Sequence, residues 1–197
     1  GRLLQPFAQL SLEVVTGQRI DKLKSCELLE MPQAFDFKQM AYAAVVTELT
    51  AVFTEDHQPQ PEVYELLEET LKLLRERNPR IVVLSFALKL LELVGLLPQV
   101  EACGVCGCTI GEEDAWFSPL QGSAICKDCH NPSGEEKFSF GTSKLFKHLK
   151  NLDFQNPATF SIKGGDLMEL EAILYKFIMF QTDKPLNSIS FLSQMGM

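Results

Sequence analysis

Two closely spaced pairs of cysteines constrain this chain more than any other feature of its sequence. Two residues separate the cysteines within each pair, and 19 residues separate the pairs. A two-residue gap lets both sulfurs of a pair point at one ion, and Gly104 and Gly107 allow the tight backbone that such a turn needs. This C-x2-C-x19-C-x2-C spacing predicts one structural zinc ion, because four thiolates leave no position open for water or substrate. The predicted ligands are Cys103, Cys106, Cys126 and Cys129.

Other interpretations of the cysteines stay open on the sequence alone. Two disulfides, or reduced buried thiols, fit less well, because disulfides are rare in the reducing compartment expected for a chain without a secretory signal. Cys108 and His130 each adjoin a cysteine pair and are alternative ligands. A metal with three protein ligands would instead indicate a hydrolase with an open catalytic position. Cys26 stands apart and is interpreted as a small apolar packing residue.

Length and hydropathy indicate a globular chain. Its 197 residues, 46% of them apolar, are enough to bury a core in one large domain or two small ones. The longest apolar runs, such as residues 81–88, are far shorter than the roughly 20 residues that cross a bilayer, so no membrane partner is expected. The sequence opens at Gly1 without a secretory signal, and we expect a cytoplasmic protein whose N-terminal segment is missing.

The distribution of charge allows two candidate surfaces for nucleic acid. The net charge of −8 counts against a simple nucleic-acid binder, because phosphate binding usually requires a basic surplus. The acidic residues, however, concentrate between residues 33 and 136, and two basic groups elsewhere are not matched by acid nearby in the sequence. The alternative for the C-terminal group is the solvated face of an amphipathic helix. The C-terminal group is Lys144, Lys147 and Lys150, and the hairpin group is Arg19, Lys22 and Lys24.

Residue periodicity divides the chain into a β section and a helical section. Alternation over residues 9–15, followed by a turn and a second strand over 20–28, predicts a hairpin. Such a hairpin needs a larger sheet or adjacent helices, because two strands alone are marginally stable in water. Apolar residues at helical spacing predict five helices, and the third is apolar almost all round, as expected for the centre of a bundle. These helices cover residues 36–53, 61–77, 80–94, 142–152 and 166–180.

Two details of the helices are also predicted. In the second helix, Tyr64, Leu67, Leu71 and Leu74 form one apolar stripe that should face the core. In the last helix, Asp166 has the position and side chain of an N-cap. The resulting fold class is mainly α: a helical bundle with a zinc-ribbon-like insertion of four cysteines, preceded by a β hairpin.

The order of these elements resembles that of the RecO family of bacterial DNA repair proteins. A hairpin entered by residues 4–7 comes first, and an apolar helix at residues 88–95 leads into the first cysteine pair. The segment 122–129 carries the second pair, and closing helices end in residues 186–192. The order of these stretches, rather than any one of them, carries the resemblance. Where the family pattern has basic residues in the tail, this chain has Leu186-Asn-Ser-Ile-Ser190, which counts against a DNA role for that segment.

The resemblance implies a division of the chain into four parts. Family members begin with an oligonucleotide-binding (OB) barrel that supplies much of the DNA-binding surface, and this chain would retain only its last strands. The parts expected are residues 1–31, the remnant of the barrel; residues 32–100, the first part of a helical domain; residues 101–136, the zinc module; and residues 137–197, the closing helices and tail.

The resemblance also implies a function without catalysis. It indicates a nucleoid-associated recombination mediator that binds single- and double-stranded DNA, joins RecR, supports loading of RecA and anneals strands. It also implies capture of the acidic, apolar-ended tail of single-strand-binding protein, which needs an apolar pocket with basic residues at its mouth. The candidates for that mouth are Arg75, Arg77, Arg80 and Lys89. The alternative is that the arginines only balance nearby glutamates on the surface.

A second class of function competes with this one. A zinc-containing adaptor for protein interaction or transcription, with no contact to DNA, would have the same cysteine spacing and the same helical bundle. An enzyme is disfavoured because the sequence has no glycine-rich phosphate loop, no nucleophile elbow and no helix-borne pair of histidines with a glutamate. Salt-dependent binding of oligonucleotides separates the mediator from the adaptor.

Overall fold

The computed structural model describes residues 4–31, 34–132, 134–156, 161–182 and 185–194. The chain forms two compact units, Gly1–Phe37 and Lys38–Met197, which are treated separately below. The predicted boundary at residue 32 and the last residues of the predicted tail, 195–197, lie outside the described residues. In the described part of the chain, no helix is long and apolar enough to cross a membrane.

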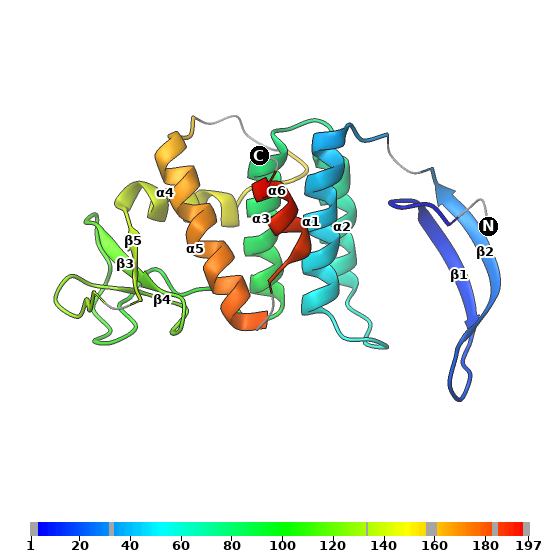
Figure 1. Cartoon of the computed structure of the whole chain (residues 1–197), viewed down its shortest axis with the longest axis horizontal. Helices are drawn as coiled ribbons and strands as arrows, with labels where there is room; N and C mark the ends of the chain where they lie inside the picture. Colours follow the sequence, from blue (N-terminus) through cyan, green and yellow to red (C-terminus); the bar gives the residue numbers. More distant parts are fainter. Residues whose placement is uncertain (1–3, 32–33, 133, 157–160, 183–184, 195–197) are drawn as a thin grey trace. The chain divides into compact units, whose positions relative to one another are not determined.

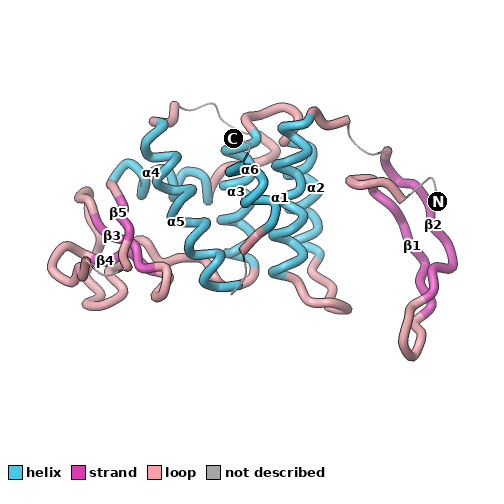
Figure 2. The backbone as a smooth tube through the Cα atoms, viewed as in Figure 1, coloured by secondary structure: helices cyan, strands magenta, loops and turns pink. Residues whose placement is uncertain are grey.

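The first unit contains the predicted hairpin. Strands β1 (Gln9–Val15) and β2 (Lys22–Glu30) are antiparallel, with Leu12 opposite Cys26 (Figures 1 and 2). The register shifts twice along the ladder, and most side chains on both faces are exposed, including Leu12 at 49%. Among the described residues the hairpin pairs with no further strand. Two strands with both faces exposed bury little apolar area. The described residues therefore do not contain the larger sheet that we predicted the hairpin to need.

The second unit is built around a bundle of helices, six of which lie in the described residues. Helix α3 has the central position, with α1 and α2 on one side and α4 and α5 on the other (Figure 1). Its side chains Phe86, Leu88 and Leu90 are fully buried, which confirms the prediction from its all-round apolar sequence. The helices are α1 (Phe37–Phe53), α2 (Pro61–Leu73), α3 (Pro79–Leu93), α4 (Phe140–Lys150), α5 (Gly164–Thr182) and α6 (Asn187–Gln194).

Both ends of α3 are specified locally. At its start, the Asn78 side chain accepts a hydrogen bond from the Arg80 N–H, and Pro79 occupies the first turn, where no donor is needed. At its end, Gly95 has φ 75° and the Leu96 N–H donates to the Leu91 carbonyl oxygen at 2.7 Å. This is a Schellman termination, which requires the left-handed conformation that glycine adopts at little cost. The predicted stop at Gly95 is confirmed.

The buried face of α2 differs from the predicted stripe. Val63, Leu66, Thr70 and Leu73 are buried. Of the predicted stripe, Leu74 is buried, Leu67 and Leu71 are half-buried, and Tyr64 is 50% exposed. The predicted stripe did not include Thr70. Its hydroxyl instead donates to the Leu66 carbonyl oxygen at 2.6 Å, so the side chain is buried with its polar group satisfied. The helix therefore turns a different face to the core than apolar spacing alone indicates.

The N-terminus of α4 is held by acidic groups from other segments. Ser139 caps it by accepting from the Thr142 N–H, so the helix begins two residues before its predicted start. The Phe140 N–H donates to Asp114, and the Ser139 N–H donates to Glu169 of α5. Asp166, predicted as an N-cap, lies within the first turn of α5, which begins at Gly164. Carboxylates near a helix N-terminus are stabilised by the exposed N–H groups and the helix dipole.

Helix α6 was not predicted as a helix of its own. Its first turn is bound by Glu48 of α1, whose carboxylate accepts from the N–H groups of Asn187 at 3.0 Å and Ser188 at 2.8 Å. Leu186 and Leu192 are buried against the bundle. The cap comes from a residue far away in the sequence, so local capping signals could not reveal it.

A small antiparallel sheet carries the cysteine segment. Strands β3 (Ala115–Ser118), β4 (Ser123–Ile125) and β5 (Glu136–Phe138) lie in the order β4-β3-β5. Strands β3 and β4 form a short hairpin between the two cysteine pairs, and β5 pairs with the other edge of β3. Phe117 of β3 makes an edge-to-face contact with Phe177 of α5, with ring centroids 6.0 Å apart, and thereby attaches the sheet to the bundle.

Candidate metal centre and binding surfaces

The first cysteine pair forms a turn whose backbone N–H groups point at the Cys103 sulfur. The Cys103 side chain is buried, and its Sγ accepts N–H groups from Cys126, at 3.4 Å, and from Val105 and Cys106. Burial raises the pKa of the Cys103 thiol, but these hydrogen bonds outweigh it and bring the pKa down to about 6. Such N–H···S bonds stabilise the thiolate, which is the form that binds metal.

The two glycines predicted to shape this turn have clear structural roles. A Cβ on Gly104 would lie 2.0 Å from the Ser123 Oγ, so only glycine fits against β4 there. The Gly104 N–H donates to the Ala124 carbonyl oxygen at 2.9 Å and ties the first cysteine pair to the strand that leads into the second. Gly107 has φ 75°, the left-handed region. The backbone therefore brings the two pairs together as the spacing predicts.

Five sulfurs gather where the two pairs meet. The Sγ atoms of Cys106 and Cys126 are 3.7 Å apart, close to the separation of about 3.8 Å that a tetrahedron with metal–sulfur bonds of about 2.3 Å requires. The Cys129 thiol interacts with those of Cys106, Cys126 and Cys103. The structure also adds Cys108, considered above only as an alternative ligand. The four Sγ atoms that all lie within 4.8 Å of one another are those of Cys103, Cys106, Cys108 and Cys126.

The protonation pattern of the cluster suits a metal ion. The Cys108 N–H and side chain lower the pKa of Cys106, and hydrogen bonds with Cys106 and Cys126 raise the pKa values of Cys108 and Cys129 to about 12. The thiols of the cluster therefore hydrogen-bond to one another and shift one another's pKa values. A bound cation replaces thiol protons and pairs with several thiolates at once. All six cysteines are described, and none of them is in a disulfide bond.

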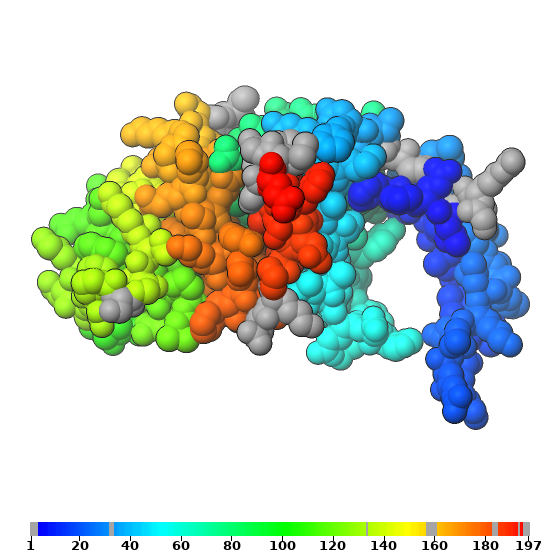
Figure 3. Space-filling model, in the orientation of Figure 1, coloured from blue at the N-terminus to red at the C-terminus, as the bar shows by residue number. Residues whose placement is uncertain are grey.

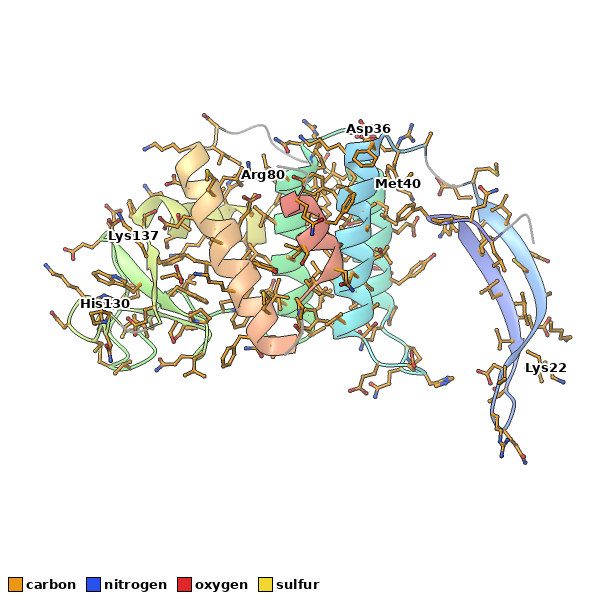
Figure 4. All side chains as sticks on the ribbon, viewed as in Figure 1. Lys22, Asp36, Met40, Arg80, His130 and Lys137 are labelled. Carbon is orange, nitrogen blue, oxygen red and sulfur yellow. The ribbon has the colours of Figure 1, made fainter. Side chains whose placement is uncertain are left out.

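His130 is engaged elsewhere. His130 is labelled in Figure 4. Its Nδ1 lies 2.5 Å from a carboxylate oxygen of Glu135, and its ring stacks on Trp116 at 4.0 Å with an interplanar angle of 15°. Among the described residues, it is not part of the group that could hold a metal. His130 packs the edge of the module, where the Glu135 carboxylate also accepts the Asn131 N–H at 3.1 Å.

The predicted C-terminal basic patch is partly neutralised by acid. Lys147 lies 3.8 Å from Glu101. Lys150 lies 2.9 Å from Glu92 of α3. Both carboxylates come from segments far away in the sequence, so lysines without acid nearby in the sequence are nevertheless paired with acid in the fold. Lys144 alone of the three has no carboxylate partner among the described residues, and its Nζ lies 4.2 Å from the centroid of the Phe140 ring.

An open hollow beside α4 collects other basic groups. Lys144 and His148 of α4 line it together with Lys163, and the Phe140 ring forms part of its wall. Asp166 also lines it, so the hollow is not uniformly basic. Sequence reasoning missed Lys163 because it lies outside the helical pattern that drew attention to Lys144.

The basic residues of the hairpin form a second exposed group. Lys24 pairs with Glu13 across the ladder at 2.5 Å. Arg19 and Lys22 are exposed and have no ion-pair partner among the described residues. The hairpin group therefore offers two of its three predicted cations without an ion-pair partner among the described residues.

An apolar cavity of about 320 Å³ lies between α1, α3, α5 and α6. Val45, Leu84 and Ile178 are among its apolar lining residues. Its charged groups are Arg80, labelled in Figure 4, and Glu171. They form a bidentate ion pair between α3 and α5. In the space-filling view, α6 (red) lies at the front of the bundle (Figure 3).

Only one of the four residues predicted to receive a peptide tail lines this cavity. Arg80 does so, whereas Arg75 and Arg77 are exposed in the connection between α2 and α3. Lys89 points elsewhere, with its Nζ 5.3 Å from the centroid of the Phe154 ring. Glu171 was missed because a pair 91 residues apart leaves no local signal in the sequence.

Comparison with known families identifies the chain. The sequence model of the family described as "Recombination protein O C terminal" matches residues 34–189, which is most of the chain. The chain belongs to the RecO family. The matched segment contains α1 to α5, the start of α6 (residues 187–189) and the cysteine module.

Individual RecO proteins agree with this assignment. A "DNA repair protein RecO" from Desulforamulus reducens is 29% identical over 195 residues, covering 98% of this chain and 76% of the relative. One from Moorella thermoacetica is 28% identical and covers 91% and 69%. One from an Anaeromyxobacter species is 34% identical over 135 residues, covering 66% and 53%. The resemblance seen in the order of sequence motifs is confirmed.

Proposed function

We propose that this chain acts as a recombination mediator in DNA repair, in the cytoplasm at the bacterial nucleoid, and without catalysing a reaction. Membership of the RecO family carries the proposal. In this role it binds single- and double-stranded DNA, joins RecR, captures the tail of single-strand-binding protein, supports loading of RecA and promotes strand annealing. The hairpin of β1 and β2 belongs to the end of an OB barrel, and its exposed apolar faces support this assignment.

The metal of this mediator is one structural zinc ion held by Cys103, Cys106, Cys126 and Cys129. Its role is to order the module of residues 101–136, which has few large apolar side chains of its own. Structural zinc contributes about 10–16 kcal/mol of apparent binding energy in small modules, enough to fold such a segment. The N–H groups directed at the Cys103 sulfur support the proposal. Metal analysis of the natively purified chain tests it, and finding no metal would contradict it.

DNA contacts run through the hollow beside α4 and the tip of the hairpin. Lys144 and Lys163 supply charge for phosphate, and the Phe140 ring offers a face on which a base can stack. Lys147 and Lys150 contribute less, because Glu101 and Glu92 already pair with them. On the hairpin, Arg19, Lys22 and Lys24 form the second contact.

The tail of single-strand-binding protein binds in the cavity between α1, α3, α5 and α6. An acidic peptide that ends in an apolar residue needs an apolar pocket for its last side chain and a cation for its carboxylate. The cavity combines these two features, because its walls are apolar and Arg80 lies on its lining. Arg75, Arg77 and Lys89, which lie outside the lining, contact at most the acidic residues that precede the end of the tail.

A competing function is a zinc-containing adaptor that never touches DNA. The deciding experiment measures binding of the whole chain to labelled single-stranded and duplex oligonucleotides between low and moderate salt. A mediator loses affinity steeply, with a slope of about −0.7 to −0.9 in log affinity per log salt for each phosphate contacted, whereas an adaptor has no affinity to lose. Absence of salt-dependent binding, together with retained binding to RecR, would favour the adaptor.

A further inference from the structure

Cys108 occupies a defined place among the sulfurs of the metal centre, although neither C-x2-C pair includes it. Its Sγ lies within 4.8 Å of those of Cys103, Cys106 and Cys126. The Cys129 thiol interacts with the same three sulfurs. A tetrahedral thiolate site takes only four sulfurs, so five are present for four positions.

The backbone fixes the position of Cys108. The Cys103 N–H donates to the Cys108 carbonyl oxygen at 2.8 Å, and Ala102 and Thr109 form an antiparallel bridge next to this bond. Gly107 makes the turn, with its N–H donating to the Cys103 carbonyl oxygen at 2.9 Å. The turn that builds the first cysteine pair therefore also holds the backbone of Cys108 beside the cluster.

We propose that Cys108 is a reserve ligand, which exchanges with Cys129 for the fourth coordination position of the metal. Two alternative four-thiolate sets then share Cys103, Cys106 and Cys126. In a tetrahedron with metal–sulfur bonds of about 2.3 Å, neighbouring sulfurs are about 3.8 Å apart, so Cys108 completes the site with a movement of about 1 Å. Cys108 is exposed, so the exchange opens no part of the core.

This inference rests on the proposed metal site and gives it a specific property. A centre with four thiols loses a ligand whenever one of them is blocked. A centre with a fifth thiol in reach retains four-thiolate coordination when either Cys108 or Cys129 is removed. The two cysteines are therefore redundant individually and essential as a pair.

A double-mutant cycle in the whole chain tests the redundancy, with Cys108→Ser, Cys129→Ser and the double variant. Cys26→Ser, in the hairpin, is the matched control. Zinc affinity is measured by competition with a chromophoric chelator, and the thiolate-to-cobalt absorption of the Co²⁺-loaded chain reports how many sulfurs are bound. Each single variant should keep the four-thiolate spectrum and lose less than about tenfold in affinity, while the double variant should lose more than about a hundredfold and show three thiolates.

Several outcomes overturn the inference. If Cys129→Ser alone weakens zinc binding as much as the double variant does, or if the two single effects simply add, Cys108 is no ligand. Unfolding of the module in Cys129→Ser, monitored by Trp116 fluorescence, would also show that Cys108 is no ligand, because a reserve ligand would preserve the fold. If the unmodified chain binds neither zinc nor cobalt, the proposed metal site itself is wrong. If the unmodified chain binds metal but the variants behave as above, only the role of Cys108 as a reserve ligand is wrong.

Discussion

Arg80 of α3 donates two hydrogen bonds to Glu171 of α5, from Nε to one carboxylate oxygen and from Nη2 to the other. Both residues line the apolar cavity, and about a third of each side chain is exposed. The hydrogen bonds with Glu171 raise the pKa of the Arg80 guanidinium. Burial, together with the Glu171 charge, raises the pKa of the nearby Tyr42 hydroxyl. Glu171 is thus already paired with Arg80, the cation that a peptide carboxylate would need.

Replacement of Glu171 should therefore strengthen binding of the tail of single-strand-binding protein. Glu171→Gln keeps the shape of the side chain but removes the competing charge, so a peptide carboxylate reaches Arg80 more readily. We expect affinity to rise several-fold, whereas Arg80→Ala should lower it about ten- to a hundredfold, because hydrogen bonds to charged groups contribute about 1.5–3 kcal/mol. Titration calorimetry with a peptide of the tail sequence measures both.

Arg75→Ala is the matched control for this experiment. Arg75 carries the same charge close by in the sequence but does not line the cavity, so its loss should change affinity little. Equal affinities for Arg80→Ala and the unmodified chain would show that the tail binds elsewhere. Weaker binding by Glu171→Gln would show that the ion pair holds the cavity in its binding form and does not compete with the ligand.

DNA binding should depend on Lys144 and Lys163 more than on Lys150. The first two line one hollow with an aromatic ring, whereas Lys150 is paired with Glu92 at 2.9 Å. The double variant with Gln at residues 144 and 163 should reduce the salt slope for duplex binding by about 1–2, and Lys150→Gln should reduce it by much less. Fluorescence anisotropy over a salt series measures the slopes. If the double variant retains the slope of the unmodified chain, the hollow is only a solvated surface.

Much of the bundle could be predicted because apolar spacing and glycine or proline stops are local. The central helix, its end at Gly95 and the hairpin over residues 9–28 follow from such patterns. The buried face of α2 could not be predicted, because burial of Thr70 depends on a hydrogen bond within the folded helix. Helix α6 was missed because its cap, Glu48, comes from another helix.

The candidate sites also combine features that a short segment of sequence reveals with features that depend on tertiary packing. The cysteine pairs and Gly104 were predictable, because ligand spacing and a tight turn are properties of a short segment. The ion pairs that neutralise Lys147 and Lys150 were not, because their carboxylates come from the end of α3 and the start of the module. Charge patterns along a sequence indicate which side chains are available, but tertiary packing decides which of them remain unpaired.

Removal of the metal should unfold the cysteine module before the bundle. Trp116 is the only tryptophan of the chain and stacks on His130 inside the module, so its emission reports this region alone. A zinc chelator should shift its emission to longer wavelength and increase amide exchange over residues 101–136, while α1 to α3 stay protected. Re-addition of zinc should restore both signals. An unchanged Trp116 spectrum after verified loss of metal would mean that the sheet holds the module without it.

The contact between Glu48 and α6 should make this helix sensitive to acid. Burial raises the pKa of the Glu48 carboxyl, but hydrogen bonds from Ser188 and Asn187 outweigh it, so the pKa lies below its ordinary value of 4.5. A carboxyl group with a lowered pKa in the folded state stabilises the fold above its unfolded pKa, and this contribution disappears as the pH falls through the folded value. The capping contribution should therefore be complete at pH 7 and decline below pH 4.5.

Glu48→Ala should accordingly lower the free energy of unfolding by about 1 kcal/mol at pH 7, the usual effect of losing a helix N-cap. Urea unfolding of the zinc-loaded chain at several pH values measures the difference between Glu48→Ala and the unmodified chain. That difference should shrink as the pH falls below 4.5, because protonated Glu48 accepts more weakly from the Ser188 N–H and hydroxyl. Asp56→Ala, at an exposed position just after α1, is the control and should leave stability nearly unchanged at every pH. A difference between Glu48→Ala and the unmodified chain that stays constant down to pH 3 would show that the carboxylate charge does not stabilise α6.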